Sequence, residues 1–470
     1  MPGSRSRTLL SKRGLNFPVR DTQPGMIHLP YVKHTLPNGV RLILVPMEGV
    51  NSVATSVMVG VGSRYETRSI NGASHFLEHM VFKGTKKYPT TEDVHIIERI
   101  GGLQNAYTDI DITNYHNKVL STDWELALEV NKELVLAPLI EQKYIDRERD
   151  VILEEMKRYE DEPAAKVGEA FHSMMYPGTT LGMRVIGEVD SMKAADAGTL
   201  QAYHDQWYRP ERIVVILAGN LGEKLKAQSS KLKTTTQSSK VIEKVEGWFG
   251  GLGNVGTLGD LGDLGNVKES QTSPQLSVVT KPDAHQAHMI IGIRTFRRGS
   301  PDRFAWSIFN MIMGVGFTSR LFKEIREKRG LCYQIYASSD SWADTGYWSI
   351  YAGVATEKVE QATRAILAEI TKVAEKGVTE EEVKIAKKRI KTILAFKSED
   401  PEFQNEYYGR RELYGESILT LDQYVAKIER VRREDVEKVA RHYITDKTLN
   451  MAMVTSKAKD TKILEMLHLP

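Results

Sequence analysis

The chain has 470 residues and a mass of 53.0 kDa, which is long for one hydrophobic core and predicts two or more domains. Its 41% hydrophobic and 27% charged content is typical of a globular protein, and no stretch approaches the roughly 20 apolar residues of a membrane span. The net charge of +3 creates no strong field, so neither nucleic acid nor an anionic membrane is favoured as a partner.

Residues 1–25 are expected to form a flexible basic tail. Its first twenty residues contain no acid and five basic residues, namely Arg5, Arg7, Lys12, Arg13 and Arg20. No apolar core follows this tail, and a secretory signal would require one. The composition of the tail is weakly similar to that of an organellar transit peptide. The single cysteine, Cys332, can form no internal disulfide, which is compatible with a reducing compartment. We therefore expect a cytoplasmic protein, with the mitochondrial matrix as the alternative.

The first domain is assigned to residues 26–220. Alternating or continuous apolar patterns predict strands at residues 40–45, 53–59, 105–115 and 213–218. A helix is expected at residues 91–100, between a Pro-Thr-Thr start and a Gly-Gly stop. Glycines 60, 62 and 72 separate the second strand from the segment that contains the most informative motif.

That motif is His-Phe-Leu-Glu-His at residues 75–79. At helical spacing His75, Glu78 and His79 share one face, and about 6 Å of axial rise lets both imidazoles reach one Zn²⁺. A metal lowers the pKa of a water to about 7, and a neighbouring carboxylate such as Glu78 can then remove its proton. The order His-x-x-Glu-His is that of the inverted zincins, but a solvated helix face explains it equally well without a third ligand.

Residues 146–156 predict a helix that could supply this ligand. Glu148 and Glu155 are two turns apart and therefore align, whereas Glu154 points about 100° away. The helical phase thus favours Glu155 as the ligand and Glu148 as a supporting acid. Taken alone, this segment is more simply an ordinary charged helix.

A linker is expected at residues 221–274. The chain is rich in Lys, Ser, Thr and Gln up to residue 240, and a Gly/Leu/Asp repeat occupies residues 250–265. Between these segments, the apolar period of residues 241–249 predicts one helix.

The second domain, residues 275–470, repeats the order of the first. Strands are predicted at residues 275–279 and 288–293, followed by helices at 304–313, 357–376 and 379–394. Thr379 and Glu382 predict a capping box at the start of the last of these helices. The positions where metal ligands would recur hold Ser307, Asn310 and Met311, so we expect a structural duplication in which one copy binds metal.

Two segments of the chain resemble the pitrilysin, insulysin and mitochondrial processing peptidase family of zinc metallopeptidases. The first is Gly-Ala-Ser-His-Phe-Leu-Glu-His-Met-Val-Phe-Lys-Gly-Thr, which contains the motif at residues 75–79, and the second is the later Glu-Arg-Asp-Val-Ile-Leu-Glu-Glu-Met. This resemblance covers residues 32–453. It implies an α+β fold of two related halves, each an antiparallel-rich sheet with helices on one face, arranged as a clamshell. It also implies one Zn²⁺ per chain, held by His75, His79 and Glu155, with Glu78 as general base and Glu148 supporting activity.

The resemblance further implies substrate-binding residues. Arg326 and Tyr333 match the family's C-terminal Arg/Tyr element, which helps to hold the substrate carbonyl, although Arg329 competes by residue type. Asn105 and Ala106 match the strand edge to which an extended peptide adds as a further strand.

These features predict a zinc-dependent endopeptidase acting on short or unfolded peptides in an enclosed chamber. The alternative is a noncatalytic scaffold or assembly subunit that keeps the fold. Because the metal-binding and Arg/Tyr elements occur in one chain, a homodimer is the simplest expectation, with a heterodimer of related subunits as the alternative.

Overall fold

The computed structural model describes residues 31–222, 236–253, 267, 270–457 and 461–469. The predicted basic tail and most of both the Lys/Ser/Thr/Gln segment and the Gly/Leu/Asp repeat lie outside these ranges. Within the linker, helix α9 (Thr236–Phe249) includes the predicted helix at 241–249.

The chain folds into two mixed sheets, each accompanied by helices. The strands of the first sheet are β1 (Val32–Thr35), β2 (Arg41–Pro46), β3 (Ser52–Val59), β4 (Leu103–Thr108), β5 (Thr113–Leu120) and β6 (Ile213–Gly219). Those of the second are β7 (Gln275–Thr280), β8 (Ala287–Thr295), β9 (Cys332–Ser341), β10 (Gly346–Val354) and β11 (Asn450–Thr455).

The helices follow the same division. Helices of the first half are α1 (Ala73–Val81), α2 (Thr91–Val94), α3 (Ile96–Arg99), α4 (Trp124–Leu136), α5 (Gln142–Asp161), α6 (Pro163–Met175), α7 (Val189–Ala194) and α8 (Ala197–Trp207). Those of the second half are α10 (Arg303–Gly314), the π-helix η6 (Phe322–Glu327), α11 (Val359–Lys376), α12 (Glu380–Ser398), α13 (Pro401–Leu413), α14 (Leu421–Arg430), α15 (Arg433–Tyr443) and α16 (Thr461–Met466). Short 3₁₀ helices are η1 (Ser63–Tyr65), η2 (Arg68–Ile70), η3 (Ser121–Asp123), η4 (Thr180–Gly182), η5 (Pro210–Arg212), η7 (Thr356–Lys358) and η8 (Asp446–Thr448).

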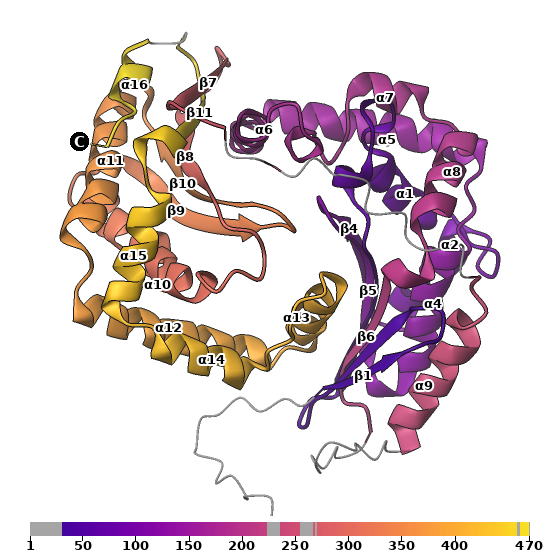
Figure 1. The fold of residues 1–470 in the computed structure, drawn as a ribbon. Helices are drawn as coiled ribbons and strands as arrows, with labels where there is room; N and C mark the ends of the chain where they lie inside the picture. Colours follow the sequence, from indigo (N-terminus) through magenta and orange to yellow (C-terminus); the bar gives the residue numbers. More distant parts are fainter. Residues whose placement is uncertain (1–30, 223–235, 254–266, 268–269, 458–460, 470) are drawn as a thin grey trace, which may run out of the picture.

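The two sheets share one topology. The first has the strand order β1-β2-β6-β3-β5-β4, and the second has the order β7-β11-β8-β10-β9. Strand β2 is parallel to β6, just as β7 is parallel to β11, and the other pairs are antiparallel. The order of the second sheet is therefore that of the first without β1, which agrees with the predicted duplication. The halves face each other as a clamshell (Figure 1).

Each half packs most of its own helices against one face of its own sheet. In the first half, the buried apolar residues of α1, α4 and α5 form one core with inward-facing residues of the strands, including Phe76, Leu128 and Ile152 with Val57 and Val215. In the second half, α10, α11, α12 and α15 do the same. The predicted arrangement of helices on one face of each sheet is confirmed.

One helix from each half crosses to the other half's sheet (Figure 1). Helix α6 packs against β7, β8 and β11, where Val167 and Phe171 share a core with Val454. Helix α13 packs in return against β2, β3 and β6, where Tyr408 shares a core with Met58 and Ile216. This reciprocal exchange ties the two halves together and was not predicted from the sequence.

Two predicted elements are divided in the structure. The strand expected at residues 105–115 is the β4–β5 hairpin, because the chain reverses at residues 109–112 and Thr108 pairs with Thr113. The helix expected at 91–100 is interrupted at His95, whose ring stacks on Phe82 with 5.9 Å between ring centroids. The Thr379/Glu382 capping box is present as predicted.

Among the residues that the structure describes, no helix is both long and apolar enough to traverse a lipid bilayer.

Candidate active site

Helix α1 presents the His-x-x-Glu-His motif to a cavity while its other side packs into the core. Phe76, Leu77 and Met80 are fully buried, whereas His75, Glu78 and His79 are partly accessible on the opposite face. The apolar and polar residues thus divide as expected for an amphipathic helix. The sequence of α1 itself directs all three functional side chains to one side.

Glu66 fixes the N-terminus of α1. Its carboxylate accepts hydrogen bonds from the backbone N–H groups of Gly72 (2.6 Å) and Ser74 (2.8 Å) and from the Asn71 side chain. Gly72 has φ +96°, and a Cβ there would lie 2.5 Å from Met192. Burial raises the pKa of Glu66 to about 7 despite these hydrogen bonds. An acid at a helix N-terminus satisfies free N–H groups and complements the helix dipole.

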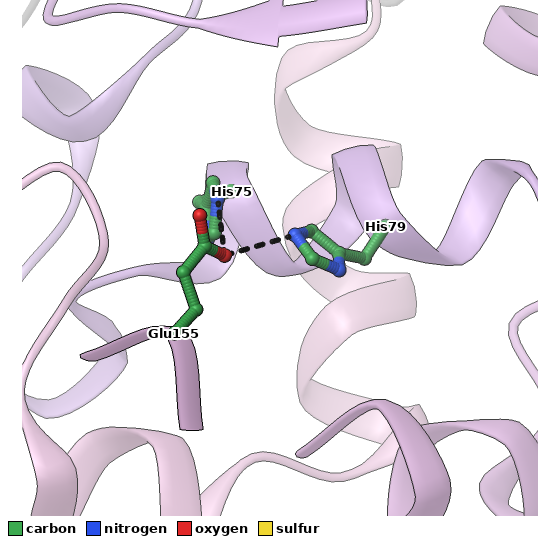
Figure 2. Close-up of side chains that lie close together, drawn as sticks. All are labelled: His75, His79 and Glu155. Carbon is green, nitrogen blue, oxygen red and sulfur yellow. Dashed lines mark ion pairs between the residues drawn. The ribbon is translucent and has the colours of Figure 1, made fainter. Parts of the chain in front are cut away.

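Helix α5 brings Glu155 to the two imidazoles, as Figure 2 shows. One carboxylate oxygen of Glu155 lies 3.7 Å from Nε2 of His75 and 3.6 Å from Nε2 of His79. Glu154, by contrast, is 71% exposed and pairs with Lys157. The helical phase that favoured Glu155 over Glu154 therefore agrees with the observed geometry.

The two imidazoles differ in their surroundings. Burial, with a smaller effect of the neighbouring His79, lowers the pKa of His75 to about 3, so this ring is neutral at physiological pH. The Nδ1 atom of His79 lies 3.2 Å from Oε2 of Glu148, and Lys83 contacts the other oxygen of Glu148 at 2.6 Å. Burial opposes ionisation of Glu148, but these two partners lower its pKa, so it is a carboxylate beside the ring.

The donor set fits zinc. The ligand atoms of His75, His79 and Glu155 all lie within 4.8 Å of one another. Donors bound at 2.0–2.1 Å to a tetrahedral ion are roughly 3.3 Å apart, so small side-chain movements would complete the site. The carboxylate of Glu148 favours the tautomer of His79 that leaves Nε2 free for a metal, an arrangement common to metal-ligating histidines.

Glu78 lies beside these ligands without belonging to them. Its Oε2 accepts a hydrogen bond from the Thr108 hydroxyl at 2.7 Å. Burial is the main cause that raises the pKa of Glu78, and the nearby Glu155 adds to it, while Thr108 and His79 act in the opposite direction. A raised pKa makes the carboxylate a stronger base.

The site opens into a cavity of about 510 Å³. His75, Glu78 and Glu155 lie on its wall, together with Tyr107 to Ile110 from the β4–β5 hairpin, residues of α6 and residues 182–186. Asp109 is paired with Arg410, and Glu169 is paired with Arg184. Glu155 also lies 3.4 Å from Arg158, so three of the four acidic residues on the wall have basic partners.

The four predicted substrate-binding residues do not line this cavity. The Arg326 guanidinium lies 5.0 Å from the ring centroid of Tyr333, which is 80% exposed, and neither residue lines the cavity beside the histidines. Asn105 and Ala106 belong to β4, the edge strand of the first sheet, and Asn105 lines a separate cavity of about 400 Å³. The contact of these four residues with a substrate stays a prediction.

Two residues of the site had no signal in the sequence analysis. Glu66 is six residues from Gly72 and fits no capping box, so only the folded loop reveals its role. Thr108 is 30 residues from Glu78 and reaches it through the pairing of the hairpin. Its place two residues after Ala106, within the predicted strand, did not indicate this contact.

Two family models and several curated proteins match most of the chain. Residues 42–189 match the family model described as insulinase (peptidase family M16), and residues 194–390 match the peptidase M16 inactive domain. An uncharacterized zinc protease of Streptomyces coelicolor is 32% identical over 409 residues, covering 87% of this chain and 86% of that protein. The uncharacterized zinc protease YmxG of Bacillus subtilis is 30% identical over 414 residues, covering 88% of this chain and 96% of that protein.

Solved structures share the fold. A protease from Helicobacter pylori superposes with a TM-score of 0.83 at 23% identity, covering 91% of this chain and all of that one. A Pseudomonas fluorescens structure described as a peptidase M16 inactive domain gives a TM-score of 0.79 at 17% identity, covering 92% and 99%. The fold and the two family models together define the class of two-domain peptidases. The chain belongs to peptidase family M16, the insulinase family.

Proposed function

We propose that this chain is a zinc-dependent endopeptidase that hydrolyses short or unfolded peptides. The observation that carries the proposal is the convergence of His75, His79 and Glu155 from two helices (Figure 2). Glu78 lies on the same cavity wall as His75 and Glu155. An assembly subunit without catalytic activity has no need for this donor set. The second half holds Ser307, Asn310 and Met311 at the related positions of α10, so one zinc per chain is proposed.

His75, His79 and Glu155 would hold the zinc, which supplies Lewis acidity and a water of lowered pKa. Glu78 is the proposed general base, since its burial raises its pKa and therefore its affinity for the proton of the attacking water. The same carboxyl group can then donate this proton to the leaving amine. Glu148 is proposed to orient His79 rather than to exchange protons with the substrate.

The substrate is proposed to bind in extended form along the edge of β4. In the described part of the sheet β4 pairs with β5 alone, so its other edge is available for main-chain hydrogen bonds. Tyr107 and Thr108, at the end of this strand, already line the cavity that His75 and Glu78 also line. A peptide that adds to β4 would therefore lead towards Glu78. Arg326 and Tyr333 are proposed to reach the substrate from the second half.

The test compares cleavage of a quenched fluorescent peptide library by the wild type, Glu78→Gln and Glu154→Gln. We expect the wild type and Glu154→Gln to cleave, and Glu78→Gln to retain one zinc per chain but lose turnover by about a hundredfold or more. Full activity of Glu78→Gln would remove Glu78 as the base. Stoichiometric zinc without cleavage by the wild type, alone or with a related subunit, would favour the scaffold alternative.

A homodimer is proposed as the assembly. Light scattering of the purified full chain at micromolar concentration should give twice the chain mass of 53.0 kDa. A monomer that is fully active would contradict this part of the proposal without affecting the assignment of the peptidase site.

A further inference from the structure

The last residues of strand β4 contact both the proposed general base and the opposite half of the molecule. Thr108 donates its hydroxyl hydrogen to Oε2 of Glu78 at 2.7 Å, while its distance to the Ser74 carbonyl oxygen is 3.5 Å. A hydroxyl carries one hydrogen, so the shorter contact takes it. One oxygen of Glu78 is thereby fixed, and the backbone N–H of Thr108 also acts on this carboxylate.

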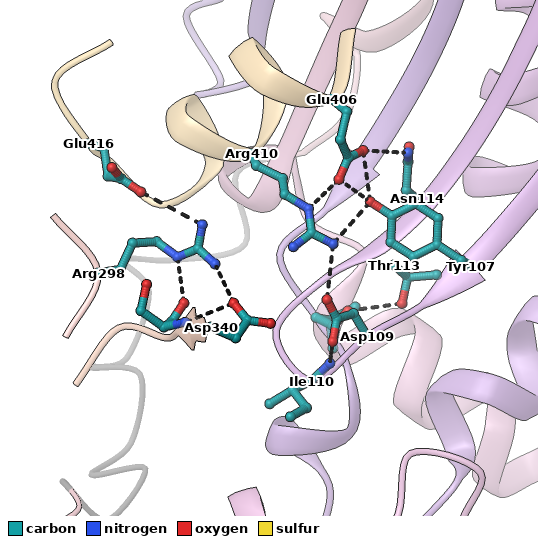
Figure 3. Close-up of polar contacts among 12 residues, drawn as sticks. Tyr107, Asp109, Ile110, Thr113, Asn114, Arg298, Asp340, Glu406, Arg410 and Glu416 are labelled. Atoms are coloured by element: carbon teal, nitrogen blue, oxygen red, sulfur yellow. Dashed lines mark hydrogen bonds and ion pairs between the residues drawn. The ribbon is translucent and has the colours of Figure 1, made fainter. Parts of the chain in front are cut away.

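The neighbours of Thr108 on either side interact with helix α13, which comes from the second half (Figure 3). The Tyr107 hydroxyl lies 2.7 and 2.8 Å from the two carboxylate oxygens of Glu406. Arg410 donates to Asp109 at 2.9 Å and to the Tyr107 hydroxyl at 3.3 Å, and it also pairs with Glu406. We call Tyr107, Asp109, Glu406 and Arg410 the interdomain clasp.

The alternation of a strand explains this division. Successive side chains of a strand point to opposite faces, so Tyr107 faces α13 whereas Thr108 faces α1. Asp109, directly after the strand, also contacts α13 through Arg410. Any shift of the clasp along the strand therefore moves Thr108 relative to Glu78. The backbone of three consecutive residues connects the two halves of the molecule to the proposed base.

The exposure of the clasp indicates that its main effect is geometric. The side chains of Arg410, Asp109 and Glu406 are 23%, 34% and 35% exposed. Ion pairs with such access to solvent contribute little to stability, far less than the apolar contacts of α13 with the first sheet. A network of this kind adds little stability but restricts the orientation of the groups that it joins.

We propose that Thr108 is a positioning residue for Glu78 and that the interdomain clasp holds Thr108 in place, so that the base is correctly oriented only while α13 rests on the first sheet. The inference rests on the proposed function, because it assigns Glu78 as the base. It adds that the second half contributes to catalysis through α13 and β4, at a distance from the metal ligands.

The first test replaces Thr108 by Val, which keeps the shape but removes the hydroxyl, and by Ser, which restores it. For Thr108→Val we expect kcat to fall by roughly 10- to 100-fold with KM within about twofold, because a misplaced group costs rate and not binding. Thr108→Ser should recover most of kcat. Zinc affinity, measured by chelator competition, should not change, and a crystal structure of Thr108→Val should show a reoriented Glu78 carboxylate.

The second test is a double-mutant cycle with Arg410→Gln and, as the matched control on the same helix, Arg411→Gln, whose guanidinium contacts the Tyr407 carbonyl. Arg410→Gln should lower kcat several-fold in the wild type and cause no further loss in Thr108→Val, whereas Arg411→Gln should have little effect. Additive losses would overturn the action of the clasp through Thr108.

The outcomes separate this inference from the proposed function. If Thr108→Val keeps the wild-type kcat while Glu78→Gln is inactive, the role of Thr108 is overturned. The peptidase assignment then stays intact. Loss of zinc in Thr108→Val, or failure of Ser to restore kcat, would also overturn it, because either result indicates a structural role. An inactive wild type would instead overturn the proposed function.

Discussion

The Nδ1 atom of His79 lies 3.2 Å from Oε2 of Glu148. Glu148 and Glu155 are seven residues apart on α5, so one helix contacts both nitrogens of His79, one through each carboxylate. Helix α5 thereby supplies a proposed zinc ligand and also fixes the tautomer of another ligand. We therefore propose different tasks for Glu148 and Glu155, although they share a residue type and a helix face.

Glu148→Gln should weaken zinc binding. The amide keeps the shape but loses the charge that favours the Nδ1–H tautomer of His79, and loss of such a partner typically costs 10- to 100-fold in metal affinity. Competition with a fluorescent zinc chelator measures the effect. Glu154→Gln, an exposed change on the same helix, is the control and should bind zinc as the wild type does. Unchanged affinity in Glu148→Gln would contradict this role.

Glu155→Gln should remove zinc more completely than Glu148→Gln does. The substitution leaves two imidazoles and no anionic ligand, and a catalytic zinc site needs three protein ligands. Metal content after gel filtration should fall from one equivalent per chain to well below half. A Glu155→Gln protein that keeps a full equivalent would show that another group completes the site.

Glu66 predicts a dependence of stability on pH. Its pKa in the folded protein, about 7, is above the ordinary 4.5, so its contribution to the free energy of unfolding is complete below about pH 4.5 and is lost as the pH rises through 7. Between pH 5 and 8 the metal-free wild type should therefore lose more stability than metal-free Glu66→Gln. Urea unfolding at both pH values measures this difference, and identical changes in the two proteins would contradict it.

Tyr408→Ala should destabilise the whole molecule and not α13 alone. Tyr408 is fully buried between α13 and the first sheet, and truncating a large buried aromatic residue to alanine costs about 3–5 kcal/mol. Because α13 belongs to one half and the sheet to the other, we expect a lower urea midpoint with both halves still unfolding together. The control is Phe396→Ala, since Phe396 is 69% exposed and its loss should cost little.

Local patterns predicted much of this fold. The apolar strands β2, β3 and β6 and the capping box at Thr379 follow from short-range periodicity and capping chemistry. The spacing of His75, Glu78 and His79, with the phase of α5, predicted the face on which the site forms. These features depend on residues within two helical turns of one another.

Features that depend on contacts between distant residues could not be predicted from the sequence. The sequence of α6 is amphipathic, but such a pattern does not specify which sheet the helix covers, and the sequence of α13 has only a weak apolar face. The hairpin turn at residues 109–112 reads Asp-Ile-Asp-Ile and lacks the Gly or Asn that usually marks a reversal. The contact of Thr108 with Glu78 arises only after that turn forms.

The most direct test of the proposed metal site is a crystal structure of the zinc-loaded protein with an anomalous difference map collected at the zinc edge. We predict one peak per chain, within about 2.2 Å of Nε2 of His75, Nε2 of His79 and a carboxylate oxygen of Glu155. A map without a peak at this position, or a zinc ion held by other residues while Glu155 faces away, would contradict the proposed site.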